Sequence, residues 1–190
     1  MAEVKILFQG YCSKDCKGHA CSTIVLVRDK DNDDKDINMV VDPGTLSDPN
    51  ILEKELAKNG LKLEDIDIVC ITHSHIDHYR NIGMFRKAKS LDYWGYWDGD
   101  LWKECDGIIT KDVKIIKTPG HSDDSITLLV NTNIGIIAIC GDVFWKEDHP
   151  KKDNYANNMK QLIKSREKLI EISDYIIPGH GKMFKAKKLI

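Results

Sequence analysis

The chain has 190 residues, of which 42% are hydrophobic and 31% charged, and its formal net charge is −2. This balance excludes an intrinsically disordered or fibrous protein and favours a single domain over residues 1–190, large enough to fold without disulfide bonds. No apolar run approaches the roughly 20 residues that span a bilayer, and residues 1–6 lack the pattern of a signal peptide. We therefore expect a cytoplasmic protein that does not contact a membrane and keeps its cysteines reduced.

Short apolar segments bounded by turn residues dominate the first third of the chain. Three of them are rich in Val and Ile and predict strands, at residues 4–8, 22–27 and 37–41. Asp48 then fits the N-cap of a helix, because Pro49 suits the first helical position and Gly60 the end. The almost wholly apolar residues 66–72 predict a strand that is buried on both faces.

The rest of the chain alternates strands with helices. A second helix is expected from about His78 towards Arg86, and a long helix over residues 154–172, where apolar residues recur at helical spacing. Four further strands are expected at residues 113–117, 125–130, 135–140 and 175–177. This order predicts a mixed α/β protein.

The segment Thr72-His73-Ser74-His75-Ile76-Asp77-His78 directly follows the apolar strand. Residues two apart in an extended chain point the same way, about 6–7 Å apart, so His73 and His75 could share one metal ion. Asp77 and His78 could face a second metal, and the carboxylate of Asp77 could take a proton from a metal-bound water. A lone His at a strand end is usually an ordinary surface residue, but three His and one Asp this close are difficult to explain by packing.

Three later positions place a similar side chain after a strand. His121 and His180 each follow Pro-Gly, and Asp142 follows Cys-Gly. Tight turns at strand ends present side chains at the rim of a sheet, where α/β proteins collect their sites. Each position alone would be an ordinary loop residue, but together they complete the ligand count of two metal ions.

In this order, the residues resemble the motifs of the metallo-β-lactamase superfamily over nearly the whole chain. The resemblance implies an αββα sandwich, with two mixed sheets face to face, helices outside, and metals in the groove at one edge. The implied ligands are His73, His75 and His121 at one metal, Asp77, His78 and His180 at the other, and Asp142 as the bridge. Asp42 would hold the ligand loops from outside, although an Asp-Pro-Gly turn explains this residue equally well.

Within the superfamily, the segments around His121, Asp142 and His180 most resemble a small single-domain branch, that of metallo-β-lactamase domain-containing protein one. The mammalian member of this branch is described as a ribonuclease acting on histone transcripts. The resemblance therefore implies RNA as one candidate substrate.

The expected cofactors are two divalent metal ions, Zn²⁺ in the first place, with Fe or Mn as alternatives because imidazole and carboxylate suit all three. Such a pair would generate a bridging hydroxide near neutral pH and stabilise the oxyanion that forms.

We expect a hydrolase of an ester-type bond, in which Asp77 is the catalytic residue that orients or deprotonates the nucleophile. β-Lactamase activity is expected only as a side reaction, because true β-lactamases lack the bridging aspartate that the resemblance implies at Asp142. A mononuclear iron oxygenase resembling the persulfide dioxygenases is the alternative.

Two substrate classes stay open. RNA is favoured by residues 151–190, which hold ten Lys or Arg residues against four Asp or Glu. A small acyl ester, thioester or lactone is favoured by five aromatic residues within 93–102, which could wall a pocket. Both features also have ordinary explanations, since surface lysines are usually solvated and aromatic residues often cover a core. No obligate protein partner is evident, and a homodimer is compatible with the sequence.

Cys12, Cys16 and Cys21, with His19 between them, lie in a loop expected near the metal groove. Their spacing matches no standard zinc finger, so we expect free thiols rather than another zinc site or a redox pair. Cys70 and Cys140 fall in apolar strands and are expected in the core.

Overall fold

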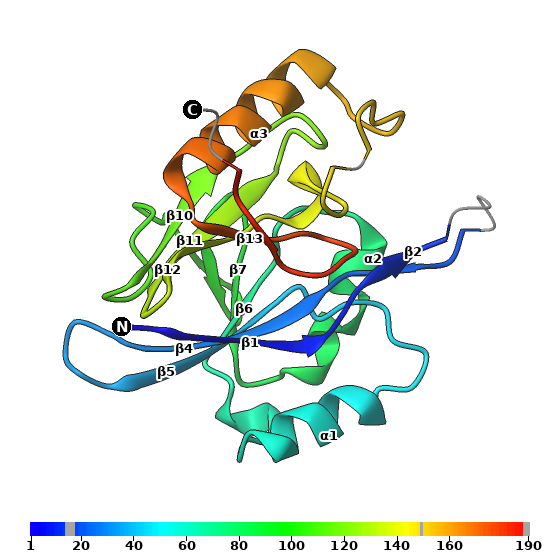
Figure 1. Ribbon diagram of the computed structural model, residues 1–190. Coiled ribbons are helices and arrows are strands. Elements are labelled where there is room, and N and C mark those ends of the chain that lie inside the picture. Colours follow the sequence, from blue (N-terminus) through cyan, green and yellow to red (C-terminus); the bar gives the residue numbers. More distant parts are fainter. Residues whose placement is uncertain (14–17, 149, 188–190) are drawn as a thin grey trace.

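The computed structural model describes residues 1–13, 18–148 and 150–187. Cys16 therefore lies outside the described residues. Within them, two mixed sheets pack face to face and carry helices on their outer faces (Figure 1).

The first sheet has seven strands, in the order β1-β4-β5-β6-β7-β8-β9. Its middle pairs, β5 with β6 and β6 with β7, are parallel, and its other pairs are antiparallel. The strands are β1 (Glu3–Phe8), β4 (Ile24–Lys30), β5 (Asp36–Val41), β6 (Ile68–Cys70), β7 (Lys89–Leu91), β8 (Tyr96–Asp98) and β9 (Leu101–Lys103).

The second sheet has five strands, in the order β10-β11-β12-β13-β14, and only β12 and β13 are parallel among its described pairs. The strands are β10 (Val113–Lys117), β11 (Ile126–Thr132), β12 (Gly135–Ile139), β13 (Tyr175–Ile177) and β14 (Phe184–Lys185). Two short strands, β2 (Tyr11–Cys12) and β3 (Ala20–Cys21), form a separate ribbon.

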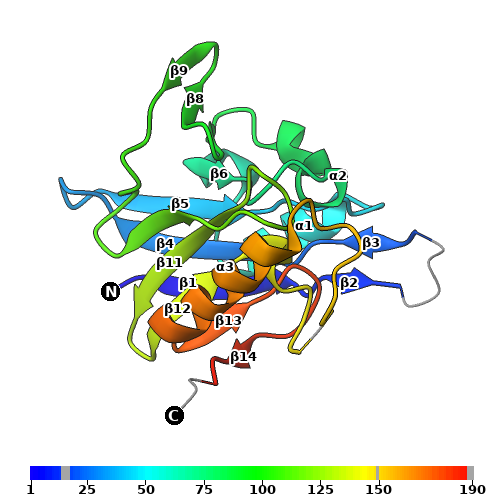
Figure 2. The same cartoon turned by 90° about the horizontal axis from the view of Figure 1, so that it is seen from above.

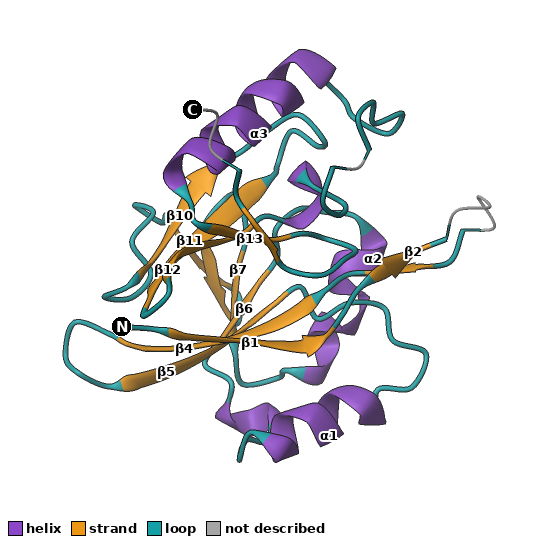
Figure 3. Ribbon diagram, viewed as in Figure 1, coloured by secondary structure: helices purple, strands orange, loops and turns teal. Residues whose placement is uncertain are grey.

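Three α-helices and three short 3-10 helices accompany the strands in the described residues. The α-helices are α1 (Asn50–Lys58), α2 (Ile76–Tyr79) and α3 (Met159–Ile172), and the 3-10 helices are η1 (Leu63–Asp65), η2 (Arg80–Met84) and η3 (Gly141–Val143). Figure 3 shows α1 and α3 on opposite sides of the molecule, with the strands between them. None of these helices combines the length and the apolar character needed to cross a membrane.

The alternation of side chains along the strands explains the layers. Val25 and Val27 of β4 belong to the core between the two sheets, together with Leu128 of β11. Leu26, between the two valines, faces the other way and packs in a separate core with Leu52 of α1. Successive residues of a strand point to opposite faces, so one apolar strand serves two cores.

The helix α3 covers the second sheet in the same manner. Its fully buried Leu162 and Leu169 pack against Leu129, Ala138 and Ile176, which lie on the outer face of that sheet. Figure 2 shows α3 lying across β11, β12 and β13. With α1 on the first sheet, the layers are helix, sheet, sheet and helix, and the expected αββα sandwich is confirmed.

Several predicted boundaries differ from the structure. The helix expected over 154–172 begins only at Met159, because the side chain of Asn158 accepts a hydrogen bond from the backbone N–H of Gln161 and caps it. The residues before Asn158 are not helical. The backbone N–H of Asn157 instead donates to the carbonyl of His121, at 3.0 Å. The aromatic segment 93–102, for which no strand was expected, contains β8 and most of β9, which project from the molecule (Figure 2).

The two parallel pairs decide where the chemistry-bearing residues meet. Val41 lies opposite Cys70 in the first sheet, and Ile139 lies opposite Ile177 in the second. Parallel partners end at the same edge of a sheet, so the residues that follow β5 and β6 emerge together, as do those that follow β12 and β13. The segments after β5, β6, β12 and β13 carry the predicted ligands and Asp42, except for His121.

Candidate metal centre

The seven predicted ligands lie together at this edge of the sandwich. They form two groups, and within each group one nitrogen or oxygen atom per residue lies within 4.8 Å of the others. The groups are His73, His75, His121 and Asp142, and Asp77, His78 and His180.

Asp142 lies between the two groups. One oxygen of its carboxylate, Oδ1, is 3.3 Å from Nε2 of His78 and 3.2 Å from Nε2 of His180. The other oxygen, Oδ2, is 3.5 Å from Nε2 of His121 in the first group. A carboxylate in this position can bind two cations at once, one through each oxygen.

The short helix α2 positions Asp77 and His78. His75 precedes the helix in an extended conformation, and the backbone N–H of His78 donates to its carbonyl at 2.9 Å. The turn directs Oδ2 of Asp77 to within 3.4 Å of Nε2 of His180. The side chain of Asp77 keeps 22% of its surface exposed, whereas His78 is fully buried. Asp77 is therefore the cluster carboxylate that solvent and substrate reach more easily.

Asp42 contacts the cluster from outside, as the resemblance implied. Its Oδ2 lies 2.7 Å from Nδ1 of His78 and accepts a hydrogen bond from the hydroxyl of Thr72 at 2.7 Å. Its Oδ1 accepts from the backbone N–H of Thr72 at 2.8 Å. The φ angle of Asp42 is +50°, a left-handed conformation that costs free energy for a residue with a Cβ and is often found at functional sites.

Three further contacts orient imidazole rings of the cluster and were missed by the sequence analysis. Oδ2 of the buried Asp153 lies 2.7 Å from Nδ1 of His121. The backbone carbonyl of Cys21 lies 3.1 Å from Nδ1 of His180, and the hydroxyl of Thr72 lies 3.1 Å from Nδ1 of His73. Asp153 lies in a polar loop without a recognisable local pattern, and every residue has a backbone carbonyl, so neither contact can be predicted from residue types. Only the tertiary structure reveals these contacts.

These contacts assign the protonation of four imidazole rings. Carboxylates and carbonyls only accept hydrogen bonds, so Nδ1 of His78, His121 and His180 must carry the proton. The hydroxyl of Thr72 gives its proton to Asp42 and therefore accepts one from Nδ1 of His73. In the neutral form of each of these four rings, the form that binds a metal ion, Nε2 carries a lone pair.

The cluster meets the chemical requirements of a metal site. Nε2 of His73, Nε2 of His78 and Oδ1 of Asp142 are buried and have no hydrogen-bond partner among the described residues. Buried polar atoms without partners are costly, and lone pairs directed at one another repel. A divalent cation would satisfy all of them, and a set of imidazoles and carboxylates suits Zn²⁺, Fe or Mn.

Burial and charge shift the protonation states of the cluster in different directions. Burial alone would lower the pKa of His78 and of His180, but the neighbouring carboxylates outweigh it and raise both pKa values. Burial lowers the pKa of His73 well below its ordinary value and also lowers that of His75, which favours their neutral form. Burial alone would raise the pKa of Asp142, but His180 and His78 outweigh it and hold that pKa well below its usual range. The carboxylate of Asp142 is therefore ionised at neutral pH.

Two glycines allow the ligand turns to approach one another. Gly141 has a φ angle of +50°, and a Cβ there would overlap the hydroxyl of Thr72. A Cβ on Gly179 would overlap Oδ1 of Asp142. Close packing of backbone against functional side chains explains why these positions carry no side chain.

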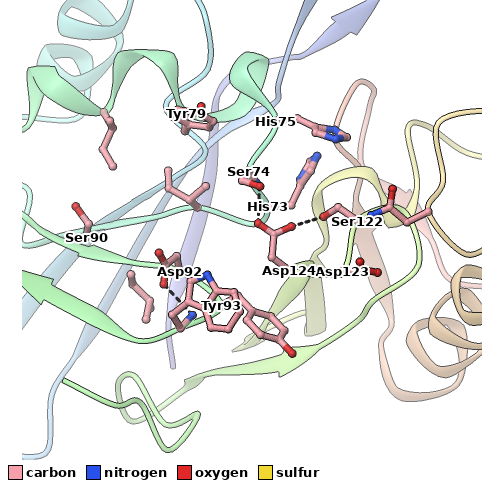
Figure 4. Close-up of a pocket in the computed structure, with 15 residues that line it drawn as sticks. His73, Ser74, His75, Tyr79, Ser90, Asp92, Tyr93, Ser122, Asp123 and Asp124 are labelled. Atoms are coloured by element: carbon pink, nitrogen blue, oxygen red, sulfur yellow. Dashed lines mark hydrogen bonds between the residues drawn. The ribbon is translucent and has the colours of Figure 1, made fainter. Parts of the chain in front are cut away.

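Two cavities open onto the cluster. The larger, of about 690 Å³, is bounded on one side by His73 and His75 (Figure 4). The other, of about 540 Å³, includes Asp77 and Asp142 in its lining. A substrate can therefore reach the proposed metals from either side.

Known proteins share this sequence pattern and fold. Residues 18–104 match the Metallo-beta-lactamase superfamily. The chain is 28% identical to metallo-β-lactamase domain-containing protein 1 of Xenopus laevis, in a match that covers 97% of the chain and 82% of that protein. It is 29% identical to the mouse protein of the same name, of which the match covers 60%, against 77% of the chain. A "probable metallo-hydrolase" of Methanocaldococcus jannaschii is 29% identical, with 80% of the chain and 75% of that protein covered.

Solved structures share the architecture. A Thermotoga maritima protein assigned to the metallo-β-lactamases superimposes with a TM-score of 0.74 at 24% identity, covering 97% of the chain and 99% of that structure. An N-acyl homoserine lactone hydrolase superimposes with a TM-score of 0.66 at 14% identity, covering 94% and 92%. At such identities the likeness shows the fold alone.

Proposed function

The chain carries a metallo-β-lactamase superfamily domain, and from this premise we propose that it is a metal-dependent hydrolase with two divalent cations, Zn²⁺ in the first place. The observation that carries the proposal is the position of Asp142 between two groups of imidazoles, with one carboxylate oxygen directed at each group. We propose His73, His75 and His121 as ligands of one cation, Asp77, His78 and His180 as ligands of the other, and Asp142 as the bridge.

Two cations held in this way would lower the pKa of a shared water towards 7 and polarise an ester-type bond. The chain itself supplies orientation. Asp42 and Asp153 accept hydrogen bonds from His78 and His121, which directs the Nε2 lone pairs of both rings into the cluster. Without these carboxylates, the rings could rotate or change tautomer, and the ligand geometry would loosen.

Asp77 is proposed as the catalytic residue. Its partly exposed carboxylate lies in the lining of the smaller cavity, next to the imidazole of His180. From there it can accept a hydrogen bond from an attacking water, orient the water towards the substrate and take its proton. The buried Asp142 is less available for this role, because both of its oxygens face imidazole rings.

The first test is the metal content, because the hydrolase and the mononuclear oxygenase predict different numbers of metal ions per chain. Elemental analysis of purified protein should find two Zn²⁺ per chain, and hydrolysis should be lost on chelation and return with added Zn²⁺. One iron per chain together with oxygen consumption would contradict the hydrolase and support the mononuclear oxygenase.

The scissile bond requires a panel of substrates: an acyl ester, a thioester, a lactone, a β-lactam, a phosphodiester and a short RNA. We expect at least one ester-type substrate to be hydrolysed only by the zinc-loaded protein, with the β-lactam at most a slow side reaction. Failure of every member of the panel with the fully loaded protein would overturn the proposed function.

A further inference from the structure

The side chains that line the larger cavity indicate which kind of substrate it can bind. Its walls are largely apolar, formed by Ile71, Tyr79, Ile82, Leu91, Tyr93 and Trp94. Figure 4 shows Tyr79 and Tyr93 among its lining side chains. Apolar and aromatic walls bind the hydrocarbon part of a small molecule.

Carboxylates supply the charged groups in the lining of this cavity. Asp92, Asp123 and Asp124 belong to it, and the lining contains no Lys or Arg among the residues that the structure describes. Lys117 is close by, but its ammonium lies 3.9 Å from the centre of the Tyr93 ring and the residue does not belong to the lining. Apart from the cations proposed at the cluster, the charges that set the electrostatic potential of the cavity are therefore mainly negative.

Asp124 is firmly held within this group. Its Oδ2 accepts a hydrogen bond from the backbone N–H of Ser74 at 3.0 Å, and its Oδ1 accepts one from the hydroxyl of Ser122 (Figure 4). Partial burial alone would raise the pKa of Asp124, but these hydrogen bonds outweigh it and lower the pKa. The residue is therefore a fixed negative charge at neutral pH.

The same cavity opens onto the proposed metal centre. His73, which is 2% exposed and has an unpartnered Nε2, belongs to its lining together with His75. A group bound against the apolar walls can therefore extend to the cluster. The cavity is placed to hold the part of a substrate that flanks the bond to be cleaved.

The lysines that favour RNA in the sequence are located elsewhere. None of those described between residues 151 and 187 belongs to the lining of either cavity at the cluster. Lys187 forms an ion pair with Glu147 at 3.0 Å, which neutralises part of the basic surplus. A polyanion would meet carboxylates rather than lysines in the larger cavity.

We propose that the larger cavity binds the acyl group of a small ester-type substrate, and that its carboxylates select neutral or positively charged acyl groups over anionic ones. This inference rests on the proposed hydrolase function and names its substrate class. In the reaction, water supplies the oxygen that bonds to the acyl carbon, the C–O bond to the leaving group breaks, and the leaving alcohol takes up a proton. RNA is then not the substrate.

Three esters of nearly equal size test the selection: p-nitrophenyl hexanoate, its 6-amino derivative and the monoester of adipic acid. Their acyl chains end in a methyl, an ammonium and a carboxylate, respectively. At an effective dielectric constant near 20, one charge pair at several ångströms changes the rate by about tenfold or more. We expect kcat/KM with the zinc-loaded protein to be at least about tenfold higher for the cationic ester than for the anionic one.

Charge-removing variants connect the selection to the cavity. The double variant Asp123→Asn with Asp124→Asn should reduce the cation-to-anion ratio to about threefold or less. Asp123→Asn alone should reduce the ratio part of the way, and because Asp123 is exposed, this substitution leaves the core of the protein unchanged. The matched control is Asp100→Asn, an equal change of charge in the exposed turn between β8 and β9, which should leave the ratio unchanged.

A binding measurement on metal-free protein separates this inference from the proposed function. Hexylammonium and hexanoate are titrated while tryptophan fluorescence is followed, because Trp94 lies in the cavity wall and is absent in the reference variant Trp94→Phe. We expect hexylammonium to bind at least about fivefold more tightly than hexanoate, and the double Asp variant to lose most of this difference.

The two proposals fail in different ways. Equal rates for the three esters, or a ratio unaffected by the Asp variants, would overturn the selection and leave the hydrolase intact. RNA cleavage that is faster than ester cleavage and falls steeply with salt would also overturn it while supporting hydrolysis. If no substrate of the panel is cleaved, the hydrolase proposal fails, and the hexylammonium titration still decides whether the cavity selects cations.

Discussion

The Nδ1 atoms of His78, His121 and His180 each lie between 2.7 and 3.1 Å from an oxygen that can only accept a hydrogen bond. At the scale of single residues, this contact sets the tautomer of the ring and so decides which nitrogen faces the cluster. His75 differs, because its own Nδ1 lies 3.0 Å from Nε2 of His121 and therefore faces the cluster itself. The carboxylates and imidazoles of the site thus form one coupled unit.

The first prediction concerns catalysis. Replacement Asp77→Asn should lower turnover at least about a hundredfold, since general base catalysis contributes 10²–10⁴-fold and an amide cannot accept a proton in this way. His75→Ala should have a similar effect through loss of a ligand. Steady-state turnover with saturating Zn²⁺ measures both, circular dichroism checks the fold, and Asp100→Asn serves as the control. Unchanged turnover in Asp77→Asn would exclude the assigned role.

The second prediction concerns Asp153, a positioning residue that contacts His121 and does not belong to the lining of either cavity at the cluster. Asp153→Ala should weaken zinc binding about 10- to 100-fold, because it leaves the imidazole of His121 without its hydrogen-bond acceptor. Asp153→Asn keeps an acceptor oxygen and should restore much of the affinity. Competition against a chromogenic chelator measures both constants. Equal zinc affinity in Asp153→Ala and the unaltered protein would remove the positioning role.

The third prediction concerns acid stability. The folded protein holds the pKa of Asp124 below its ordinary value of about 3.9, so the residue stabilises the fold above that pH and loses this contribution as the pH falls through the lowered pKa. Asp124→Asn should therefore be less stable than the unaltered metal-free protein at pH 7, with a smaller difference at pH 3. Urea midpoints at the two pH values measure this. A difference that does not shrink on acidification would contradict it.

At the scale of elements, the turns after β12 and β13 interlock. The backbone N–H of Gly179 donates to the carbonyl of Gly141 at 2.9 Å, and the Cα of Gly179 lies against the carboxylate of Asp142. Two turns that are distant in the sequence therefore position the carboxylate of Asp142. Such contact depends on both strands ending at the same edge, which their parallel pairing provides.

The fourth prediction uses this contact. Gly179→Ala should displace the carboxylate of Asp142 and reduce zinc binding at least about tenfold, because the added methyl group would overlap Oδ1. Gly83→Ala is the matched control: no atom lies within 4 Å of its Cβ position, and its φ angle is not in the left-handed region. Zinc titration by calorimetry compares the two. Unchanged zinc affinity in Gly179→Ala would contradict this prediction, because it would show that the turn accommodates the added methyl group without displacing Asp142.

At the scale of the whole molecule, the proposed ligands come from both halves of the sandwich. His73 and His78 follow β6 of the first sheet, whereas Asp142 and His180 follow β12 and β13 of the second. Cations bound between them would therefore connect the two sheets across the edge of their common core. Binding to the folded state alone stabilises it by mass action.

The fifth prediction follows from this connection. Zinc at 100 times its dissociation constant should stabilise the protein by about 2.7 kcal/mol, which for a chain of this size raises Tm by about 5–10 °C. Calorimetry with and without a chelator measures the shift. The variant His180→Ala should show a smaller shift, and an unchanged Tm on zinc removal would contradict binding between the sheets.

The sequence alone located all seven residues that the structure brings into the cluster, because turn residues after apolar strands can be recognised from their immediate neighbours. Asp42, which contacts His78 and Thr72, was indicated only by the family resemblance, because an Asp-Pro-Gly turn explained this residue equally well. The start of α3 and the strands β8 and β9 were missed, since the N-cap at Asn158 and the pairing of Trp97 with Trp102 were not recognised among competing local signals.

Other features depended on tertiary structure. Asp153 and His121 are 32 residues apart, and Asp124 reaches Ser74 across 50 residues. Such contacts form only when the two sheets have packed together. The local sequence around one partner does not predict which residue the other partner is. The residue types and their order thus determined the kind of chemistry that the chain can perform. The packing of the sheets decided which side chains orient the ligands and which charges line the cavity, because these are set by distances in space and not by spacing along the chain.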